Sequence, residues 1–482
     1  MLVVSILASA AAQGLPAGLT AVQAPTGPVV GTTDGAVRAF LGIPYAEPPV
    51  GALRFRPPVP ASPWAAPLDA RSYGRQCPQI GGGAAIGDED CLVLNVWSPE
   101  GAVDRPVMVF VHGGSFTSGS GSVDTYEGTN LAANGDAVIV TINYRLGALG
   151  FLVTDALEAE SSDGRVGNVG IQDQVMALEW VRENIAAFGG DPDNVTVFGE
   201  SAGGISTCIL ATIPAAEDVM DKAILESAAG CHHLGSVDGP GAVGGNAAPL
   251  DYGADMVDAL GCTDAPDLLD CLQAAPVEDF LDLVTATSLL SDAMNARFPA
   301  PWVDGTFVPE QPGARFASGD VDLPMIVGTT ADEATMFLGT QAPLTWFGVD
   351  DQVEAFVGPG PLVDAVLDIY DFWTFPLPRD AYLGFATDVM FSCPSRAIAD
   401  ATSEGAPTYL YEFRDVQLTT AVLGAHHALE IPYLFDTFGS MAMLPTPSER
   451  ALGADMRRAW TRFAATGSPE VDGGWAPYTD GG

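Results

Sequence analysis

Basic residues are scarce in this chain: 19 lysines and arginines stand against 61 aspartates and glutamates, and the only lysine is Lys222. The formal net charge of −42 repels phosphate groups, which argues against nucleic acid and anionic lipid as partners. Two explanations of the acidity remain open. It can be a solubilising surface in a chain rich in alanine and glycine, or an adaptation to salt, in which counterions screen the repulsion between carboxylates.

Long uninterrupted apolar runs are also missing. No internal stretch reaches the roughly 18 apolar residues that a transmembrane helix needs, so we expect no membrane span. The N-terminal sequence LVVSILASAAAQ has an apolar core followed by small residues suited to signal-peptidase cleavage, although no basic region precedes the core. We therefore interpret residues 1–24 as a secretory signal or disordered terminus. Ordered chain is expected to begin near Pro25, in a single domain of residues 25–482.

The cysteine and histidine spacings typical of zinc sites, CxxC and His-x-x-x-His, are absent, so no metal is expected. Cys77 and Cys91 bracket a glycine-rich loop, and Cys262 and Cys271 bracket a second short loop. This arrangement predicts two disulfides in a secreted or periplasmic protein. Seven cysteines leave at least one unpaired. The others are interpreted as small buried apolar residues: Cys208, Cys231 and Cys393.

Short apolar runs alternate with helical patterns along the chain. Residues 106–111 and 137–144 are runs of the kind buried in a parallel sheet. Between residues 171 and 188, apolar residues recur at steps of three and four, which predicts an amphipathic helix. Further strands are predicted at residues 195–198, 222–227, 324–330 and 408–413, and a helix at residues 449–465 with a core-facing stripe of Leu452, Met456, Trp460 and Phe463.

This alternation predicts an α/β fold with a central, mostly parallel sheet flanked by helices. Residues from about 230 to 320 break the rhythm with loops rich in glycine, proline and alanine and with short helical pieces. We expect this insertion to form a cap over the carboxyl edge of the sheet.

The pentapeptide GESAG at residues 199–203 fits G-x-S-x-G, the pattern of a nucleophile elbow. It lies between a predicted strand and a helix-like segment, the order that an elbow requires. Glycines flank the turn because side chains there would collide with the neighbouring strand and helix. Since the turn lifts Ser201 above the sheet, this residue is the predicted nucleophile.

A serine hydroxyl needs a base to accept its proton and a carboxylate to orient that base. In proteins with this elbow the order along the chain is serine, acid, histidine. Asp332 and Glu333 follow the strand predicted at residues 324–330, and only His426 and His427 lie beyond them. The order excludes the remaining histidines as the base: His112, His232 and His233. Asp332 and Glu333 both remain candidates for the acid, and His426 and His427 both remain candidates for the base.

The sequence HGGSF at residues 112–116 directly follows the strand predicted at residues 106–111. Gly113 and Gly114 allow two backbone N–H groups to face an incoming oxygen without a Cβ in the way. With the N–H of Ala202 they form a predicted oxyanion hole. The motifs together predict an enzyme that forms an acyl-enzyme and requires no cofactor.

The chain resembles the type-B carboxylesterases, a family with the α/β-hydrolase fold, from about residue 27 to near its end. The stretches that carry the resemblance include FLGIPYAEPPVGALRFRPP, EDCLVLNVWSP, FVHGGSF, NYRLGALGFL, GNVGIQDQVMALEWVRENIAAFGGDPDNVTVFGESAGG, GTTADEATMF and HHALEIPYLF. By these motifs, Ser201 resembles the nucleophile, Glu333 the acid and His427 the base. The resemblance implies a serine esterase that hydrolyses carboxylic esters.

The resemblance also implies a buried polar network behind the triad, made by Glu200, Ser227 and Glu430. It implies the same two disulfides, Cys77–Cys91 and Cys262–Cys271.

Two departures from the family narrow the expected substrates. The loop of the first predicted disulfide is short and has no aromatic residue, whereas cholinesterases carry a tryptophan there and lipases of the family form a long lid from it. We therefore expect small short-chain or aryl esters rather than choline esters or triglyceride droplets. Five aromatic residues are candidates for the substrate pocket, although the core is at least as good a place for each: Phe116, Trp302, Phe337, Trp346 and Phe347.

Three alternatives stay open. The same triad can hydrolyse amides or carbamates, and residues 230–320 can supply the lid of a lipase. Relatives such as neuroligins use the fold as a non-catalytic adhesion module.

Overall fold

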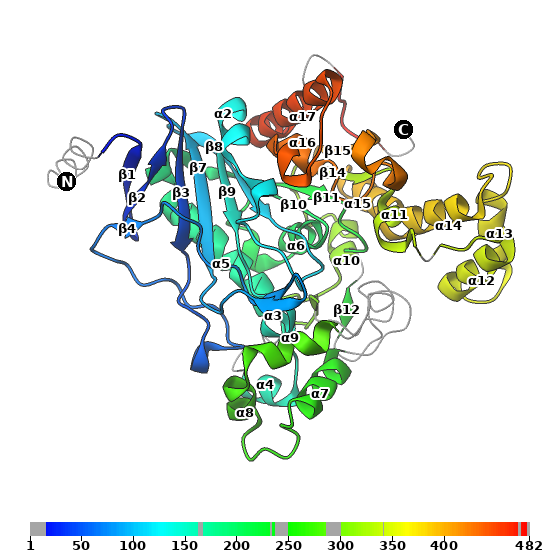
Figure 1. The fold of residues 1–482 in the computed structure, drawn as a ribbon, viewed down its shortest axis with the longest axis horizontal. Coiled ribbons are helices and arrows are strands. Elements are labelled where there is room, and N and C mark those ends of the chain that lie inside the picture. The colour runs from blue at the N-terminus through cyan, green and yellow to red at the C-terminus, as the bar shows by residue number, and fades with distance from the viewer. Residues whose placement is uncertain are drawn as a thin grey trace.

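The computed structural model describes residues 16–161, 167–231, 234–236, 249–285, 300–340, 342–470 and 474–479. Within them, an 11-stranded sheet carries helices on both faces (Figure 1). Its order is β1-β2-β3-β7-β9-β8-β10-β11-β14-β15, and β4 pairs with β2. The strands are β1 Leu19–Ala24, β2 Gly27–Thr33, β3 Val37–Pro44, β4 Leu68–Asp69, β7 Val93–Pro99, β8 Arg105–Val111, β9 Val138–Ile142, β10 Gly190–Glu200, β11 Lys222–Glu226, β14 Met325–Thr330 and β15 Thr408–Phe413.

Every neighbouring pair from β9 to β15 is parallel, whereas the path from β1 through β9 is antiparallel. The prediction of an α/β fold with a mostly parallel sheet is confirmed for the half that carries the functional motifs. Parallel strands place their carboxyl ends at one edge of the sheet. The loops after β8, β10, β11 and β14 therefore lie near one another at that edge.

Helices of various lengths connect and flank the strands. The α-helices are α2 Thr129–Gly135, α3 Gly147–Phe151, α4 Asp155–Glu160, α5 Val169–Asn184, α6 Ala202–Leu210, α7 Pro249–Ala259, α8 Leu268–Ala274, α9 Val277–Thr285, α10 Pro312–Ala317, α11 Glu333–Leu338, α12 Trp346–Val357, α13 Pro361–Ile369, α14 Pro378–Thr387, α15 Cys393–Thr402, α16 Ile431–Phe435 and α17 Pro447–Thr466. In Figure 1, α12, α13 and α14 extend away from the sheet as an arm beyond α11.

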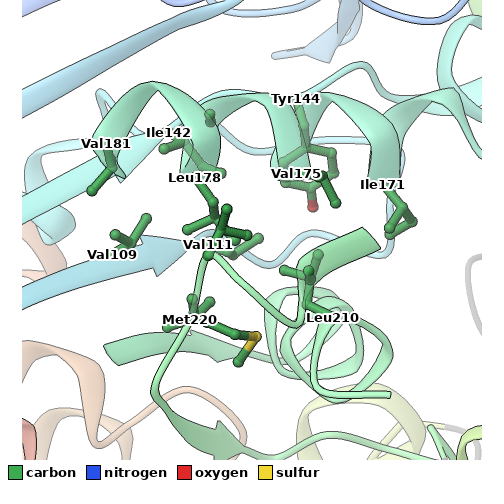
Figure 2. Packing of buried hydrophobic residues seen from close by; sticks show 14 of the residues in the cluster. Val109, Val111, Ile142, Tyr144, Ile171, Val175, Leu178, Val181, Leu210 and Met220 are labelled. Atoms are coloured by element: carbon green, nitrogen blue, oxygen red, sulfur yellow. The ribbon is translucent and has the colours of Figure 1, made fainter. Parts of the chain in front are cut away.

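Alternate residues of β8 serve two separate cores, as expected for side chains that alternate across a strand. Val109 and Val111 belong to the core beneath α5 and α6, whereas Met108 and Phe110 belong to the core beneath α16 and α17. Figure 2 shows the first core, where the apolar stripe of α5 faces the sheet; the labelled members of the stripe are Ile171, Val175, Leu178 and Val181.

Three details of the sequence prediction are wrong. Ordered chain begins before Pro25, because Leu19–Ala24 forms β1 and pairs antiparallel with β2. Strand β10 begins at Gly190 rather than at residue 195, with an irregular register between them. Leu452 of α17 is 36% exposed, although the other three members of its predicted stripe are buried. The signal peptide stays a prediction, since residues 1–15 lie outside the described residues.

Part of the predicted insertion also lies outside the described residues, at 232–233, 237–248 and 286–299. Its described helices α8 and α9 pack against α4 and α3, next to the loops that follow β9. Its role as a cap stays a prediction.

Three disulfides connect described residues. The predicted bonds Cys77–Cys91 and Cys262–Cys271 are present. The interpretation of the remaining cysteines as small buried residues is confirmed for the burial of Cys208 and Cys231 and is wrong for Cys393. Cys208 of α6 is bonded to Cys231, and Cys393 is an exposed free thiol. Within the described ranges, no helix is long and apolar enough to cross a membrane.

Candidate active site

Ser201 occupies a sharp turn between the end of β10 and the start of α6. Its backbone has a φ of 59° and a ψ of −123°, a region that L-residues adopt rarely and at a cost in energy. A Cβ on Gly199 would lie 2.5 Å from the carbonyl carbon of Gly203, and a Cβ on Gly203 would collide with the carbonyl oxygen of Val111. The glycines of the motif are therefore required by packing, as the elbow pattern predicts.

The glycine loop after β8 lies directly against this turn. A Cβ on Gly113 would approach the Cβ of Ser201 to 3.0 Å, so only a glycine backbone fits there. The backbone N–H groups of Gly113, Gly114 and Ala202 donate no hydrogen bond to any other described residue. Three free donors beside a serine are suited to hold a developing oxyanion.

Glu333, the first residue of α11, bonds to His427. Oε2 of Glu333 lies 2.6 Å from Nδ1 of His427, and both side chains are buried. The other oxygen, Oε1, accepts hydrogen bonds from Ser227 Oγ at 2.6 Å and from the backbone N–H of Thr330 at 2.8 Å. Both carboxylate oxygens are therefore fixed, and the imidazole takes its orientation from them.

The neighbouring candidates have different contacts. Asp332 accepts a hydrogen bond from the N–H of Ala425 at 2.8 Å, so it holds the loop that leads to the histidines. His426 directs Nδ1 at the carbonyl oxygen of His427, 2.9 Å away. Of the residues that the sequence left open, the structure brings together Glu333 and His427.

Glu200, which precedes Ser201, reaches the other nitrogen of the imidazole. Its Oε1 lies 3.0 Å from Nε2 of His427. The angles do not satisfy those of a hydrogen bond, and among the described residues Nε2 has no hydrogen-bond partner, Ser201 included. We therefore treat the contact as electrostatic. Nε2 therefore lies against the residue that directly precedes the nucleophile in the elbow.

The two flanking carboxylates change the titration of the imidazole. Burial by itself lowers the pKa of His427, but the charges of Glu200 and Glu333 outweigh burial and hold the pKa well above its ordinary value. The site is therefore built to stabilise an imidazolium.

More buried carboxyl groups lie behind the site than the sequence prediction contained. Both oxygens of Glu430 are buried without a hydrogen-bond partner among the described residues. Burial, followed by the charges of Glu200, Glu226 and Glu333, holds the pKa of Glu430 well above its usual range. Sequence reasoning included Glu430 in the network but missed Glu226. Burial raises the pKa of Glu226 to about 8.

A sequence signal for Glu226 did exist. The strands β10 and β11 both end in a Glu-Ser pair, Glu200-Ser201 and Glu226-Ser227. The register of the sheet places Glu200 opposite Glu226. Both serines have a positive φ, 59° at Ser201 and 51° at Ser227. Two neighbouring parallel strands thus each end at a glutamate followed by a serine of positive φ, and the second serine bonds to Glu333.

The remaining histidines do not belong to the pair of Glu333 and His427. His112 is buried and stacks on Tyr144 with ring centroids 4.5 Å apart, and burial lowers its pKa to about 4. His232 and His233 lie outside the described residues.

Of the predicted pocket aromatics, only Phe337 contacts the catalytic candidate His427, with ring centroids 4.8 Å apart. Phe391, which the sequence analysis did not single out, flanks the same imidazole at 5.2 Å. Phe116 and Trp302 are core residues, whereas Phe347 is 83% exposed.

Comparison with known proteins agrees with this geometry. The sequence model of the carboxylesterase family matches residues 19–353 and 376–481. The para-nitrobenzyl esterase of Bacillus subtilis is 37% identical over 470 residues, which cover 94% of this chain and 91% of that protein. The fumonisin B1 esterase of Sphingopyxis macrogoltabida is 35% identical over 461 residues, which cover 91% of this chain and 80% of that protein.

Among solved structures, a PNB esterase superposes with a TM-score of 0.82 at 36% sequence identity, over 95% of this chain and 93% of that one. Sequence and structure therefore agree over nearly the whole length of the chain. The chain belongs to the carboxylesterase family, shares its α/β-hydrolase fold and is a carboxylic ester hydrolase.

Proposed function

We propose that the chain is a serine esterase that hydrolyses small short-chain or aryl esters through an acyl-enzyme. Ser201 is the nucleophile, His427 the base and Glu333 the residue that orients it. The observation that carries the proposal is the position of His427, bonded to Glu333 at 2.6 Å on one side and facing the elbow on the other.

In the proposed reaction, Ser201 Oγ attacks the ester carbonyl carbon while Nε2 of His427 accepts the hydroxyl proton. The carbonyl oxygen becomes negatively charged and is held by the free N–H groups of Gly113, Gly114 and Ala202. The carbon–oxygen bond to the alcohol then breaks, and His427 returns its proton to the leaving oxygen. Water attacks the acyl-serine by the same steps and releases the acid.

The electrostatics of the site favour this sequence of proton transfers. The imidazolium that forms during attack lies between the carboxylates of Glu200 and Glu333. A charge that develops in a buried site is stabilised strongly by fixed groups of opposite sign. No organic cofactor or metal is needed for any of these steps.

The substrate class is inferred from what surrounds the imidazole and from the relatives. Phe337 and Phe391 place two aromatic rings beside His427, which supports an apolar or aryl group on the ester. A relative that matches over most of its length is a para-nitrobenzyl esterase by name. The loop between Cys77 and Cys91 has no aromatic residue that could hold a choline group.

We also propose a domain organisation and a cellular location for the protein. We assign residues 25–482 to a single catalytic domain, with the segment at about 230–320 inserted beside the site. The three disulfides and the signal-like N-terminus support a secreted or periplasmic location. The acidic surface argues against nucleic acid as a partner.

The test is the burst of p-nitrophenol from p-nitrophenyl butyrate, measured for wild type and Ser201→Ala at the same concentration. We expect a burst near one equivalent per chain in wild type and none in the variant, because the acyl-enzyme needs the serine hydroxyl. A variant that is folded by circular dichroism and as fast as wild type would contradict the proposal. Faster turnover of the matching p-nitroanilide would favour an amidase instead.

A further inference from the structure

The backbone of Glu226 directly contacts the nucleophile turn. Glu226 is the last residue of β11, and its carbonyl oxygen accepts the N–H of Ser201 at 3.0 Å. The same oxygen would lie 2.5 Å from a Cβ on Gly204, so it is wedged between the turn and the first turn of α6. Because Ser201 has a positive φ, its conformation depends on such outside contacts.

The side chain of Glu226 is anchored from the opposite side of the sheet. Its Oε1 accepts a hydrogen bond from the indole N–H of Trp460 at 2.8 Å, across 234 positions of sequence. Trp460 is buried in α17, and its ring contacts the ring of Tyr411 with centroids 5.2 Å apart. Oε2 of Glu226 is buried without a partner among the described residues. A single bond from Trp460 therefore holds this carboxyl group.

The titratable groups that face Glu226 are acidic. Glu200 lies opposite it in the register of β10 and β11. Glu430, which precedes α16, and Tyr411 of β15 both interact with its charge. Strand β14 and helix α6, which also pack against β11, contain no charged residue. A negative charge at Glu226 would therefore be repelled by Glu200 and Glu430 and would find no cation on β14 or α6.

The lysine of β11 and the buried arginine of α17 are engaged elsewhere. Lys222 lies at the other end of β11 and bonds to the side chain of Asn194 at 2.5 Å. Arg457 of α17 directs its guanidinium at the Tyr433 carbonyl oxygen and at Asp436. Burial raises the pKa of Glu226 to about 8, and the charge of Glu200 adds to this effect while the Trp460 bond opposes it. The carboxyl group is thus protonated at neutral pH.

We propose that Glu226 is a positioning residue of the active site, which is clamped by Trp460, fixes the backbone of Ser201 and keeps an uncharged carboxyl group beside Glu200. This inference rests on the proposed function, because it assigns Glu226 a role toward the nucleophile Ser201. Ionisation of Glu226 repels Glu200 and the oxyanion that forms at Ser201. The enzyme therefore loses activity as Glu226 gives up its proton.

The experiment compares kcat and KM for p-nitrophenyl butyrate between pH 6 and pH 10 in wild type and three variants. Glu226→Gln keeps an oxygen that can accept the Trp460 bond but cannot ionise. Glu226→Ala removes the side chain, and Trp460→Phe removes the indole N–H donor but keeps a smaller aromatic ring. Trp373→Phe serves as a matched control, because Trp373 is 86% exposed on the arm.

Wild type is expected to lose kcat at alkaline pH with an apparent pKa near 8, whereas Glu226→Gln retains its kcat there and is close to wild type at pH 7. Glu226→Ala and Trp460→Phe are expected to lower kcat by about tenfold to a hundredfold with little change in KM, because small displacements of reacting atoms have effects of this size. If Glu226 served only packing, Glu226→Gln would not change the alkaline limb of the kcat profile.

The proposal is overturned if Glu226→Gln keeps the alkaline limb of wild type, or if Glu226→Ala and Trp460→Phe are folded and fully active. If the alanine variant does not fold, the pH profile of the glutamine variant decides alone. The burst in wild type and its absence in Ser201→Ala are measured in the same series. A burst that persists in Ser201→Ala would refute the proposed function itself, whatever the Glu226 variants do.

Discussion

Oε1 of Glu200 lies 3.0 Å from Nε2 of His427, so the ring nitrogen opposite Glu333 also meets a carboxylate. The histidine of this site is thus held between two acids rather than oriented by one. Both acids favour the imidazolium, the form that His427 takes when it accepts the serine proton. Glu200 therefore stabilises the same imidazolium as Glu333, but from the other ring nitrogen, although it directly precedes the nucleophile in the chain.

Replacement of Glu200 by glutamine tests this arrangement. Loss of one of the two charges lowers the pKa of His427, so the acidic limb of kcat/KM is expected to move to lower pH by about one pH unit or more. kcat is expected to fall, because the imidazolium in the transition state loses a stabilising charge. The exposed Glu217→Gln is the control for the loss of any one acidic charge. If the acidic limb of kcat/KM does not move in Glu200→Gln, Glu200 has no effect on the pKa of His427.

The two adjacent histidines are expected to differ strongly in mutants. His427→Ala removes the base and is expected to lower kcat by about 10⁴-fold or more. His426→Ala loses only a contact to the carbonyl oxygen of His427, so much of the activity is expected to remain. Steady-state hydrolysis of p-nitrophenyl butyrate measures both. The opposite ranking would mean that His426 is the base.

The two adjacent acids provide a second matched pair. In Glu333→Gln the side chain keeps its size, but it no longer fixes the tautomer or the charge of His427, and we expect kcat to fall by about 10³- to 10⁴-fold. In Asp332→Asn the amide oxygen still accepts the N–H of Ala425, so activity is expected to stay within a few-fold of wild type. Equal losses in both variants, measured at the pH optimum, would contradict the assignment of the acid.

Much of the site was predictable from the sequence, because the residues that form a nucleophile elbow are consecutive in the chain. The motif GESAG after an apolar strand identifies Ser201 as the residue at the turn. The structure explains its glycines, because a Cβ on Gly203 would collide with the carbonyl oxygen of Val111. Chain order alone could not choose between Asp332 and Glu333. That choice depends on which side chain points toward Ser227 and His427, a matter of how α11 begins.

The features that escaped prediction depend on contacts between distant residues. Trp460 follows helical spacing and was predicted to lie in the core, but its indole N–H bonds to Glu226 across 234 positions, which no periodicity reveals. The bond between Cys208 and Cys231 likewise depends on how α6 packs against the loop after β11. At the N-terminus, β1 is an edge strand whose alternation is too weak to mark it as a strand.

The buried acids predict how stability depends on pH. The pKa of Glu430 is raised well above its usual range in the folded chain, so the folded state binds this proton more tightly than the unfolded state does. Its effect on the free energy of unfolding is absent at pH values below the pKa of the unfolded state. Above it, stability falls by up to about 1.4 kcal/mol per pH unit until the pKa of the folded state is reached.

Glu430→Gln removes this loss, because glutamine does not titrate. The melting temperature of the variant minus that of wild type is therefore expected to increase between about pH 4.5, the usual pKa of a glutamate, and pH 8. Calorimetry at several pH values measures the difference, and the exposed Glu217→Gln controls for a change in net charge. A difference that stays constant over this range would mean that Glu430 titrates alike in both states.

The disulfide between Cys208 and Cys231, a pairing that the sequence left open, is expected to stabilise the fold. Cys208 of the helix after the nucleophile is bonded to Cys231, 23 positions along the chain. In the chain-entropy model a closed loop of this length is worth about 3 kcal/mol. Cys208→Ala combined with Cys231→Ala is therefore expected to lower the melting temperature clearly. Cys393→Ala leaves it unchanged, because this thiol is free and exposed. Titration of the denatured, unreduced wild type with a thiol reagent should find one thiol, and finding three would mean that Cys208 and Cys231 are not joined.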